Sequence, residues 1–436
     1  YLVSVKHNGG YKNVYFGGTG KNPDYHRAKY EIVNRNNNSS RDFHVPRLNK
    51  LVTEVVPAVM TDAFNSGAYF DKNRFPVFYR LGSGTQYTKD PDGTKHWIQG
   101  AYQYLTGGTV GSPSISDWSF VSATENVYSS ANGPLGSFGE SGDSGSPLFA
   151  WDTLRNSWVL VGVLDSKIPN GNRWVILMPE FIKSVIAKDN TDPDIHMLEE
   201  NGILKWSFNA DTGKGTLTHE NSGSNWTMHG IKDSNSDAGK NLTFSGESGI
   251  IQLQNNIDQG AGALTFDSNY IVKSDNNHSW KGAGITVNSG ITVDWRISGV
   301  ADDRLHKLGA GTLLVQGTGI NPGGLNVGEG TVILKQQADA SGNKQAFSSI
   351  DIVSGRPTVV LGDAEQVDAN NIYFGYRGGR LDLNGNSVSL SRIKAADNGA
   401  MIVNHNADTA AKITLNGNGS NNTNSDQAYL GFFGEK

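Results

Sequence analysis

Short apolar runs separated by glycine, asparagine and serine recur along the whole chain. In the first part of the chain these runs have irregular spacing, and varied polar segments lie between them. We expect strands at residues 1–5, 51–56, 77–81, 158–164 and 174–177. This irregular pattern is typical of a globular all-β domain.

One stretch departs from the strand pattern. Residues 179–188 carry apolar side chains at positions 181, 182, 185 and 186, the spacing of one amphipathic helix. The residues after the helix are polar and include Pro193, as is typical of a linker. We therefore expect a first domain over residues 1–190 and a linker over residues 191–205.

The sequence pattern changes beyond about residue 200, where short apolar segments typical of strands alternate with glycine and asparagine. We expect strands at residues 241–244, 263–266, 284–287, 330–334, 380–383 and 412–415. The anchors 242, 264 and 285 are 22 and 21 residues apart, close to one coil of a solenoid. A right-handed parallel β-helix over residues 206–436 would turn Leu264 and Ile285 inward. The alternative is an ordinary β-sandwich of short strands.

Composition narrows the class of protein. A chain of 436 residues exceeds what one core usually organises. Its 37 Lys and Arg against 42 Asp and Glu form no long single-sign run, so nothing indicates binding of nucleic acid or anionic lipid. The absence of cysteine excludes disulfides, thiolate catalysis and cysteine-based zinc sites. We expect neither a cofactor nor a metal, and the apolar runs are too short to cross a bilayer.

The segment G-E-S-G-D-S-G-S-P-L-F, residues 139–149, places a serine in a glycine-bounded turn ahead of an apolar strand. A nucleophilic hydroxyl needs such a turn, because it exposes Oγ and lets backbone N–H groups converge on a developing oxyanion. We expect Ser144 as the nucleophile and the N–H groups of Gly142 and Ser144 as the oxyanion donors. Alternatively, the segment is only a hairpin turn.

A serine nucleophile requires a base, normally an imidazole oriented by a carboxylate. His7 follows the apolar residues 1–5, and Asp42 opens the segment 42–48. Both placements suit the roles of base and orienting carboxylate. The other upstream histidines, His26, His44 and His96, lie in polar or loop contexts, and we interpret them as surface or structural residues.

Several motifs together resemble the serine protease autotransporters of enteric bacteria. They are V-K-H-N-G-G-Y, D-F-H-V-P-R-L-N-K-L-V-T-E-V, Y-R-L-G-S-G-T-Q and G-D-S-G-S-P-L-F, which occur in this order along the chain. Residues 304–317 also resemble the repeat of autotransporter passenger β-helices. The resemblance covers nearly the whole chain and joins a catalytic motif to an architectural one.

The resemblance implies an all-β fold, with a chymotrypsin-like double β-barrel protease domain ahead of the β-helix stalk. It implies a catalytic triad of His7, Asp42 and Ser144. The first strands of the family's protease domain and its translocator barrel are expected to lie outside this sequence, upstream and downstream. The chain would be a bacterial serine endopeptidase, secreted or held at the cell surface after passing the periplasm and outer membrane.

The resemblance also implies substrates and partners. Host extracellular proteins, either mucin-type glycoproteins or haemoglobin-like proteins, would be cleaved, and the chain's own translocator barrel would be a partner during export. We expect a monomer. By position, Phe138 would form the base of the substrate pocket, and Leu164, Asp165 and Ser166 its wall. Since no carboxylate occupies position 138, we expect apolar or small P1 side chains to be preferred over basic ones.

Two other functions remain open. The chain could be an adhesive or binding β-helix passenger with an inactive or accessory protease domain. It could also be a carbohydrate-active β-helix enzyme, which would need clustered carboxylates on the stalk. The densest charge group there, residues 302–304, is interpreted as a solvated corner.

Overall fold

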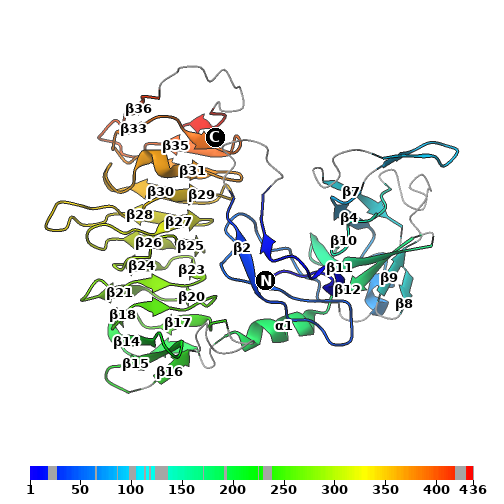
Figure 1. The fold of residues 1–436 in the computed structure, drawn as a ribbon, viewed down its shortest axis with the longest axis horizontal. Coiled ribbons are helices and arrows are strands. Elements are labelled where there is room, and N and C mark those ends of the chain that lie inside the picture. The colour runs from blue at the N-terminus through cyan, green and yellow to red at the C-terminus, as the bar shows by residue number, and fades with distance from the viewer. Residues whose placement is uncertain are drawn as a thin grey trace. The chain divides into compact units, whose positions relative to one another are not determined.

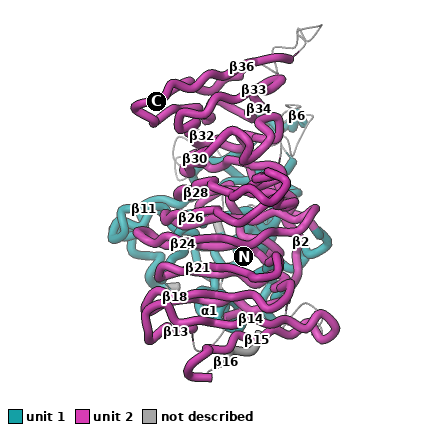
Figure 2. The backbone as a smooth tube through the Cα atoms, turned by 90° about the vertical axis from the view of Figure 1, so that its left-hand side faces the viewer, with its two compact units in different colours: residues 1–12, 34–47, 57–188 teal, residues 13–33, 48–56, 189–436 magenta. Residues whose placement is uncertain are grey.

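The computed structural model describes residues 1–17, 27–63, 66–85, 87–97, 105–111, 114–116, 119–122, 136–169, 171–190, 194–223, 225–228, 238–417 and 429–435. The chain forms two compact units, coloured separately in Figure 2. Unit 1 comprises residues 1–12, 34–47 and 57–188, and unit 2 comprises residues 13–33, 48–56 and 189–436. The chain therefore passes between the units several times before residue 189.

Unit 1 is built on one antiparallel sheet (Figure 1). Its described strands are, in spatial order, β7 (Thr106–Val110), β4 (Phe78–Gly82), β10 (Pro147–Asp152), β11 (Ser157–Ile168), β12 (Gly171–Ile176), β9 (Ser119–Ser122) and β8 (Ser114–Ser116). Alternate residues of β4 and β10 face the core, which includes Phe78, Leu148 and Ala150. The predicted strands at 77–81, 158–164 and 174–177 are confirmed, whereas a double barrel remains a prediction.

Helix α1 (Pro179–Lys188) confirms the predicted amphipathic helix. Ile182 and Val185 are buried on one face, and Phe181 and Ile186 are partly buried beside them. The strand predicted at residues 1–5 is wrong, because this segment forms no ladder: it has an isolated antiparallel bridge from Ser4 to His44 and a backbone bond from the Leu2 amide to Pro46 O at 2.9 Å. Among the described residues, no helix has the length and apolar character that crossing a bilayer requires.

Unit 2 is a parallel β-helix with two long ladders. One ladder runs through β13 (Ile195–Met197), β17 (Leu242–Gly246), β20 (Ala263–Phe266), β23 (Gly284–Val287), β25 (Arg304–Leu308), β27 (Gly324–Val327), β29 (Ile350–Ile352), β31 (Ile372–Phe374) and β34 (Lys394–Ala395). The other runs through β16 (Asn225–Met228), β15 (Lys214–His219), β14 (Gly202–Asn209), β18 (Gly249–Leu253), β21 (Tyr270–Ser274), β24 (Thr292–Trp295), β26 (Thr312–Val315), β28 (Thr331–Leu334), β30 (Thr358–Leu361), β32 (Gly379–Asp382), β35 (Ala400–Val403) and β37 (Phe432–Phe433). Its first three strands, β16, β15 and β14, pair antiparallel, and the pairing is parallel from β14 onward.

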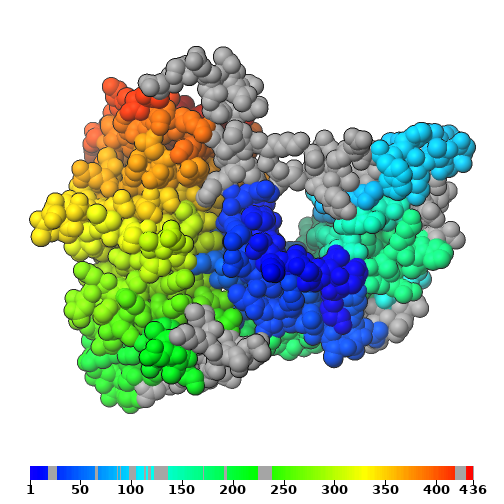
Figure 3. All heavy atoms as spheres, viewed as in Figure 1, coloured from blue at the N-terminus to red at the C-terminus, as the bar shows by residue number. Residues whose placement is uncertain are grey.

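The register of these ladders follows the sequence spacing. Leu242 pairs with Leu264, and Leu264 pairs with Ile285, all in parallel and all fully buried. In Figure 3 the colour changes from green through yellow to orange along the stack, so successive segments of chain form successive layers. The parallel β-helix is confirmed. The β-sandwich alternative is wrong, because a sandwich of short strands would pair them mainly antiparallel.

Smaller elements complete the description. They are η1 (Lys6–Asn8), η2 (Ser66–Phe70), η4 (Ala369–Asn371), β1 (Asn13–Val14), β2 (Tyr30–Asn34), β3 (Arg47–Leu48), β5 (Tyr87–Lys89), β6 (Lys95–Trp97), β19 (Ile257–Asp258), β22 (Trp280–Lys281), β33 (Val388–Leu390) and β36 (Ile413–Leu415). The pairs β19–β22 and β33–β36 lie on a further face of the β-helix. The range predicted as a linker, 191–205, contains β13 and the start of β14.

Within unit 2, residues 48–56 pack against the coils of the β-helix. Lys50 Nζ lies 2.7 Å from Asp303 Oδ1 and donates to Gly282 O at 2.6 Å. The amide of Leu51 donates to Ala283 O at 2.8 Å. The strand predicted at residues 51–56 is wrong, since this extended segment bonds to the coils without forming a ladder.

The charge group at residues 302–304 has partners as well. Besides the ion pair from Asp303 to Lys50, Arg304 Nη2 lies 3.1 Å from Asp351 Oδ1. The interpretation of this group as a solvated corner is therefore wrong for Asp303 and Arg304. Asp303 links the segment around Lys50 to the β-helix, and Arg304 links its own coil to Asp351 of a later coil. The group is therefore not a cluster of carboxylates.

Candidate active site

Ser144 lies on a tight loop directly before β10. The loop has two glycines with positive φ, Gly142 at 93° and Gly145 at 83°, a backbone region that residues with a side chain rarely adopt. A side chain at Gly145 would also collide with the Ser4 hydroxyl, since a Cβ there would lie 2.2 Å from Ser4 Oγ. Leu164 of β11 fixes the end of the loop, because its carbonyl accepts from the Gly145 amide at 2.7 Å.

Two backbone donors of this loop are unused. The N–H groups of Gly142 and Ser144 donate to no group that the structure describes, whereas those of Asp143, Gly145 and Ser146 all have acceptors at 2.7–3.0 Å. Gly142 and Ser144 are the residues predicted to form the oxyanion hole. Gly142 is exposed and Ser144 is half-buried, so both amides are open to an oxygen of a ligand.

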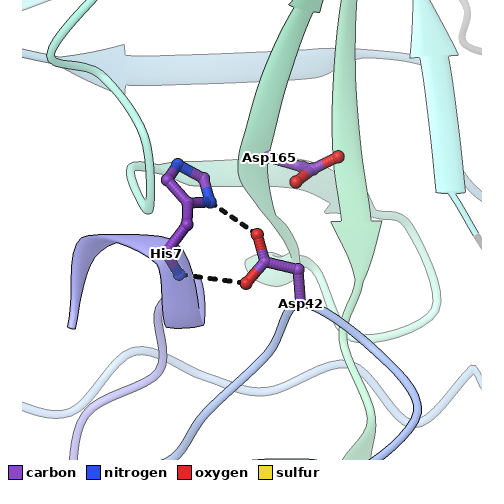
Figure 4. Close-up of side chains that lie close together, drawn as sticks. All are labelled: His7, Asp42 and Asp165. Atoms are coloured by element: carbon purple, nitrogen blue, oxygen red, sulfur yellow. Dashed lines mark hydrogen bonds and ion pairs between the residues drawn. The ribbon is translucent and has the colours of Figure 1, made fainter.

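His7 and Asp42 are in direct contact (Figure 4). His7 belongs to η1, and its Nδ1 lies 2.5 Å from Asp42 Oδ2, while its backbone amide donates to Asp42 Oδ1 at 3.1 Å. Burial opposes ionisation of Asp42, but the hydrogen bonds from His7 outweigh it and lower the pKa of this carboxyl. A carboxylate at Nδ1 places the ring proton there and leaves Nε2 free to accept a proton.

The structure brings His7 and Asp42 together but does not join them to Ser144 by a hydrogen bond among the described residues. The half-buried Ser144 is instead held through its backbone, since Asn8 Nδ2, one residue after His7, donates to Ser144 O at 2.5 Å. Hydrogen bonds between a nucleophile and its base are often long in proteins without substrate. The predicted triad therefore remains a prediction. The contact between His7 and Asp42 supports it, and the hydrogen bond between His7 and Ser144 is not formed among the described residues.

A second carboxylate lies beside this pair. Asp165 of β11 offers an oxygen to a cluster with His7 and Asp42, in which the three nearest polar atoms lie within 4.8 Å of one another (Figure 4). Burial raises the pKa of Asp165, and so do the hydrogen bond with the Asp42 carboxyl and the charge of Asp42. The Ser166 hydroxyl, 3.1 Å from Asp165 Oδ2, partly opposes this effect. A metal ion would have to compete with His7 for Asp42.

A cavity of about 530 Å³ opens beside the loop. Its described lining residues are Ser4, Asn8, Tyr11, Leu81, Gly82, Ser83, Leu105, Gly142, Asp143, Ser144, Gly145, Ser146 and Pro147. The predicted pocket residues Phe138, Leu164, Asp165 and Ser166 are not among them. Near Phe138, Asn172 of β12 exchanges two hydrogen bonds of 2.9 Å with the backbone of Gly139, which fills the space beside that glycine.

The other upstream histidines are placed as follows. His44 is fully buried, with Nε2 3.1 Å from the Tyr11 hydroxyl, which agrees with a structural role. His96 is exposed and lies 2.7 Å from Asp90, and His26 is outside the described residues.

The contribution of Asp143 and its partner Arg80 to the loop of Ser144 was not predicted from the sequence. The sequence signal was a charged residue at a core-facing position of the strand F-Y-R-L-G.

Comparisons with known proteins relate this chain to autotransporter proteins, several of which are named as serine proteases. Residues 1–180 match the family model described as "Immunoglobulin A1 protease". The "Serine protease SepA autotransporter" of Shigella flexneri is 47% identical over 418 residues, which cover 95% of this chain and 30% of the relative. The "Adhesion and penetration protein autotransporter" of Haemophilus influenzae is 41% identical over 498 residues, which cover 100% of this chain and 35% of the relative. The chain thus spans about a third of these curated relatives.

Solved structures are similar over almost the whole chain. The crystal structure of the Haemophilus influenzae Hap adhesin has a TM-score of 0.89 at 38% identity, covering 99% of this chain and 51% of that one. The passenger domain of the Plasmid encoded toxin from enteroaggregative Escherichia coli has a TM-score of 0.66 at 24% identity, covering 95% of this chain and 41% of that one. This second likeness concerns the fold alone.

Proposed function

We propose that this chain is a member of the immunoglobulin A1 protease family and a secreted serine endopeptidase, the passenger of an autotransporter. The observation that carries the proposal is the pair of unused backbone donors at Gly142 and Ser144. The two amides lie on either side of Asp143, on the turn that carries Ser144, and neither is occupied by a protein acceptor among the described residues. A loop that stabilises an oxyanion needs both of them.

In the proposed reaction, Ser144 Oγ attacks the carbonyl carbon of the scissile peptide bond and gives its proton to His7 Nε2. Asp42 keeps the ring oriented and stabilises the imidazolium. The carbonyl oxygen becomes an oxyanion that accepts hydrogen bonds from the amides of Gly142 and Ser144. His7 then protonates the leaving amine, and water hydrolyses the acyl-enzyme by the same steps.

The substrates and partners follow from the same proposal. We assign host extracellular proteins as the substrate class, with mucin-type glycoproteins or haemoglobin-like proteins as the specific candidates, and a translocator barrel as the partner in export. The chain would act as a monomer, secreted or at the bacterial surface. Phe138, Leu164, Asp165 and Ser166 are proposed to form the P1 pocket.

The proposal is tested by Ser144→Ala together with Ser141→Ala, an exposed serine of the same loop, as the matched control. Purified variants are assayed on a mixed peptide library and with a fluorophosphonate that labels activated serines. We expect Ser144→Ala to lose labelling and at least about 10⁴-fold in kcat, while Ser141→Ala keeps both. Activity retained by Ser144→Ala would overturn the assignment.

An adhesive passenger is the second candidate, because two similar proteins are named for adhesion. In that case the β-helix surface would bind a host ligand without peptide-bond cleavage. Binding of the chain to epithelial cells, measured with wild type and Ser144→Ala, separates the two functions. Equal binding with loss of cleavage would show that both functions coexist, and binding by a protein that never cleaves would favour adhesion alone.

A further inference from the structure

The loop that carries Ser144 is attached to the sheet through a buried ion pair. Arg80 of β4 and Asp143 of the loop are 2% and 4% exposed, and Arg80 Nη2 lies 3.0 Å from Asp143 Oδ2. Two charges removed from water this completely are costly unless every remaining hydrogen-bonding position of the carboxylate is used. The carboxylate therefore needs a full set of partners, although Arg80 Nε is buried without one among the described residues.

Those partners all belong to the loop or to the end of β4. Asp143 Oδ1 accepts from the Gly84 amide at 2.7 Å, and Oδ2 accepts from the Glu140 amide at 2.9 Å as well as from Arg80. The other terminal nitrogen, Arg80 Nη1, donates to Phe138 O at 3.0 Å and to the Ser137 hydroxyl at 2.8 Å. One guanidinium thus contacts both the start and the end of the segment 137–143.

The end of β4 is shaped for this contact. A Cβ at Gly82 would lie 2.2 Å from Asp143 Oδ1, and a Cβ at Gly84 would lie 2.7 Å from the Asp143 amide. Only glycine allows the loop to approach so closely at both positions. The Thr85 amide adds a further backbone bond to Ser141 O at 2.8 Å.

Asp143 stands between the two residues with unused amides, Gly142 and Ser144. The bonds of Asp143 to Glu140 and Gly84, with the bond from Thr85 to Ser141 O, fix the turn on both sides of it and so determine where those two N–H groups point. We propose that Arg80 is a positioning residue, which holds Asp143 and the Phe138 carbonyl so that the oxyanion donors are set before substrate arrives. This inference rests on the proposed function, because it assigns a role to the same loop.

A role in positioning differs from a role in neutralising a buried charge. Donors fixed in advance stabilise the oxyanion more than the ground-state carbonyl, so Arg80 should affect kcat and not KM. If Arg80 only neutralises Asp143, removing both charges should restore activity. If Arg80 also holds the Phe138 carbonyl, removing both charges should not restore activity.

The test uses Arg80→Met, Arg80→Lys and the double variant Arg80→Met/Asp143→Asn. For Arg80→Met we expect kcat to fall about 10²-fold with KM within about threefold, and affinity for a peptide boronate, which forms a tetrahedral adduct with the nucleophile, to fall by the same factor. Arg80→Lys, which keeps the charge, should recover part of kcat. The double variant should regain thermal stability but not kcat. If Arg80→Met alone does not fold, the double variant still measures the effect of losing Arg80 on kcat.

Arg74→Met is the matched control. Arg74 Nη2 lies 2.9 Å from the fully buried Asp152 at the opposite end of β10, so this variant also leaves a buried carboxylate unpaired. It should lower the melting temperature without changing kcat. Full kcat in the double variant, or unchanged boronate affinity in Arg80→Met, would overturn the inference. If Ser144→Ala is inactive in the same assays, the proposed function survives that result, whereas activity of Ser144→Ala overturns the proposed function itself.

Discussion

In the β-helix, Leu242, Leu264 and Ile285 stack in one inward row, and each coil repeats the contact made by the coil before it. In unit 1, by contrast, the ion pair between Arg80 and Asp143 and a few hydrogen bonds hold the loop on which the proposed chemistry depends. The first arrangement spreads its stability over many equivalent contacts, as repeat architectures do. The second concentrates its effect in a few groups. Substitutions in the two regions should therefore change different properties, stability in the stalk and rate at the site.

After Ser144→Ala, the largest effect on rate is expected from Asp42→Asn. An amide in place of the carboxylate no longer fixes the Nδ1–H tautomer of His7, so kcat should fall about 10⁴-fold while thermal stability changes little. Asp90→Asn is the control, because Asp90 forms an exposed ion pair with His96, 2.7 Å away, on the hairpin β5–β6. Steady-state kinetics on one peptide substrate measure both variants. A loss of less than tenfold in Asp42→Asn would contradict the triad.

Leu264→Asp should show the distributed character of the stalk. A carboxylate at this fully buried position has no partner in the inward row, so we expect a loss of about 4 kcal/mol in unfolding free energy. Hydrogen exchange should increase mainly in the strands β17, β20 and β23, with distant coils still protected. Thr265→Asp, which is only half-buried on the next position of β20, should cost less than about 1 kcal/mol. Equal exchange along all coils would show that the stalk unfolds as one unit.

Lys50→Met tests the attachment of residues 48–56 to the coils. Burial lowers the pKa of Lys50 and the Asp303 carboxylate partly counteracts this, so the pair depends on both partners. Removing Lys50 leaves Asp303 largely buried without a counter-charge, and we expect a loss of about 3 kcal/mol by urea unfolding. Lys29→Met removes an exposed pair with Glu31 at 2.9 Å and should leave the urea midpoint nearly unchanged, because water screens that pair. Similar losses in the two variants would rule out a special role for the buried pair.

Selectivity for the P1 side chain should be a smaller effect. Phe138 offers no carboxylate, and the nearest acid in the loop, Glu140, already has ion pairs with Lys95 at 3.4 Å and Lys167 at 3.2 Å. We expect apolar or small P1 side chains to be cleaved about 10–200-fold faster than Arg. Tetrapeptide substrates that differ only at P1, as Phe, Leu, Ala or Arg, measure the ratio. Preferred cleavage after Arg would show that an acid reaches the pocket.

Asp165→Asn should give the smallest change, visible as a pH dependence. Burial and the neighbouring Asp42 raise the pKa of Asp165 above the usual value near 3.9, so its ionisation costs stability at neutral pH. Below about pH 4 the carboxyl is protonated in both states and the cost disappears. Asp165→Asn should therefore raise stability by less than about 1 kcal/mol at pH 7 and not at pH 3, as thermal unfolding would show. A gain at both pH values would point to a packing effect instead.

The stalk could be predicted from the sequence because its structure is periodic. The spacings of 22 and 21 residues between Leu242, Leu264 and Ile285 are the register of the parallel ladders itself. The same reasoning failed at residues 51–56. An apolar pattern shows that a segment is extended and packed, but it does not show whether its backbone bonds to a neighbouring strand or to the turns of a distant coil.

The candidate site could be predicted only in part. The glycine-bounded turn and the order of His7, Asp42 and Ser144 are local signals, and they located the residues. The partner of Asp143 is 63 residues away in the sequence, and the approach of Asp165 to Asp42 depends on which face of β11 turns toward the site. Such contacts between distant segments leave no periodic trace in the sequence.

The chain crosses between the two units after residues 12, 33, 47, 56 and 188. His7 and Asp42 accordingly lie on separate short pieces of unit 1, and the piece with Asp42, residues 34–47, is bounded on both sides by chain that belongs to the stalk. A gene fragment ending near residue 190 would leave residues 13–17, 27–33 and 48–56 without the coils of the unit to which they belong. For the same reason, a single nick near residue 190 would release neither unit. A fragment that carries the proposed active site must therefore include the coils that belong to the same unit as residues 48–56, and it cannot be defined by one cut in the sequence.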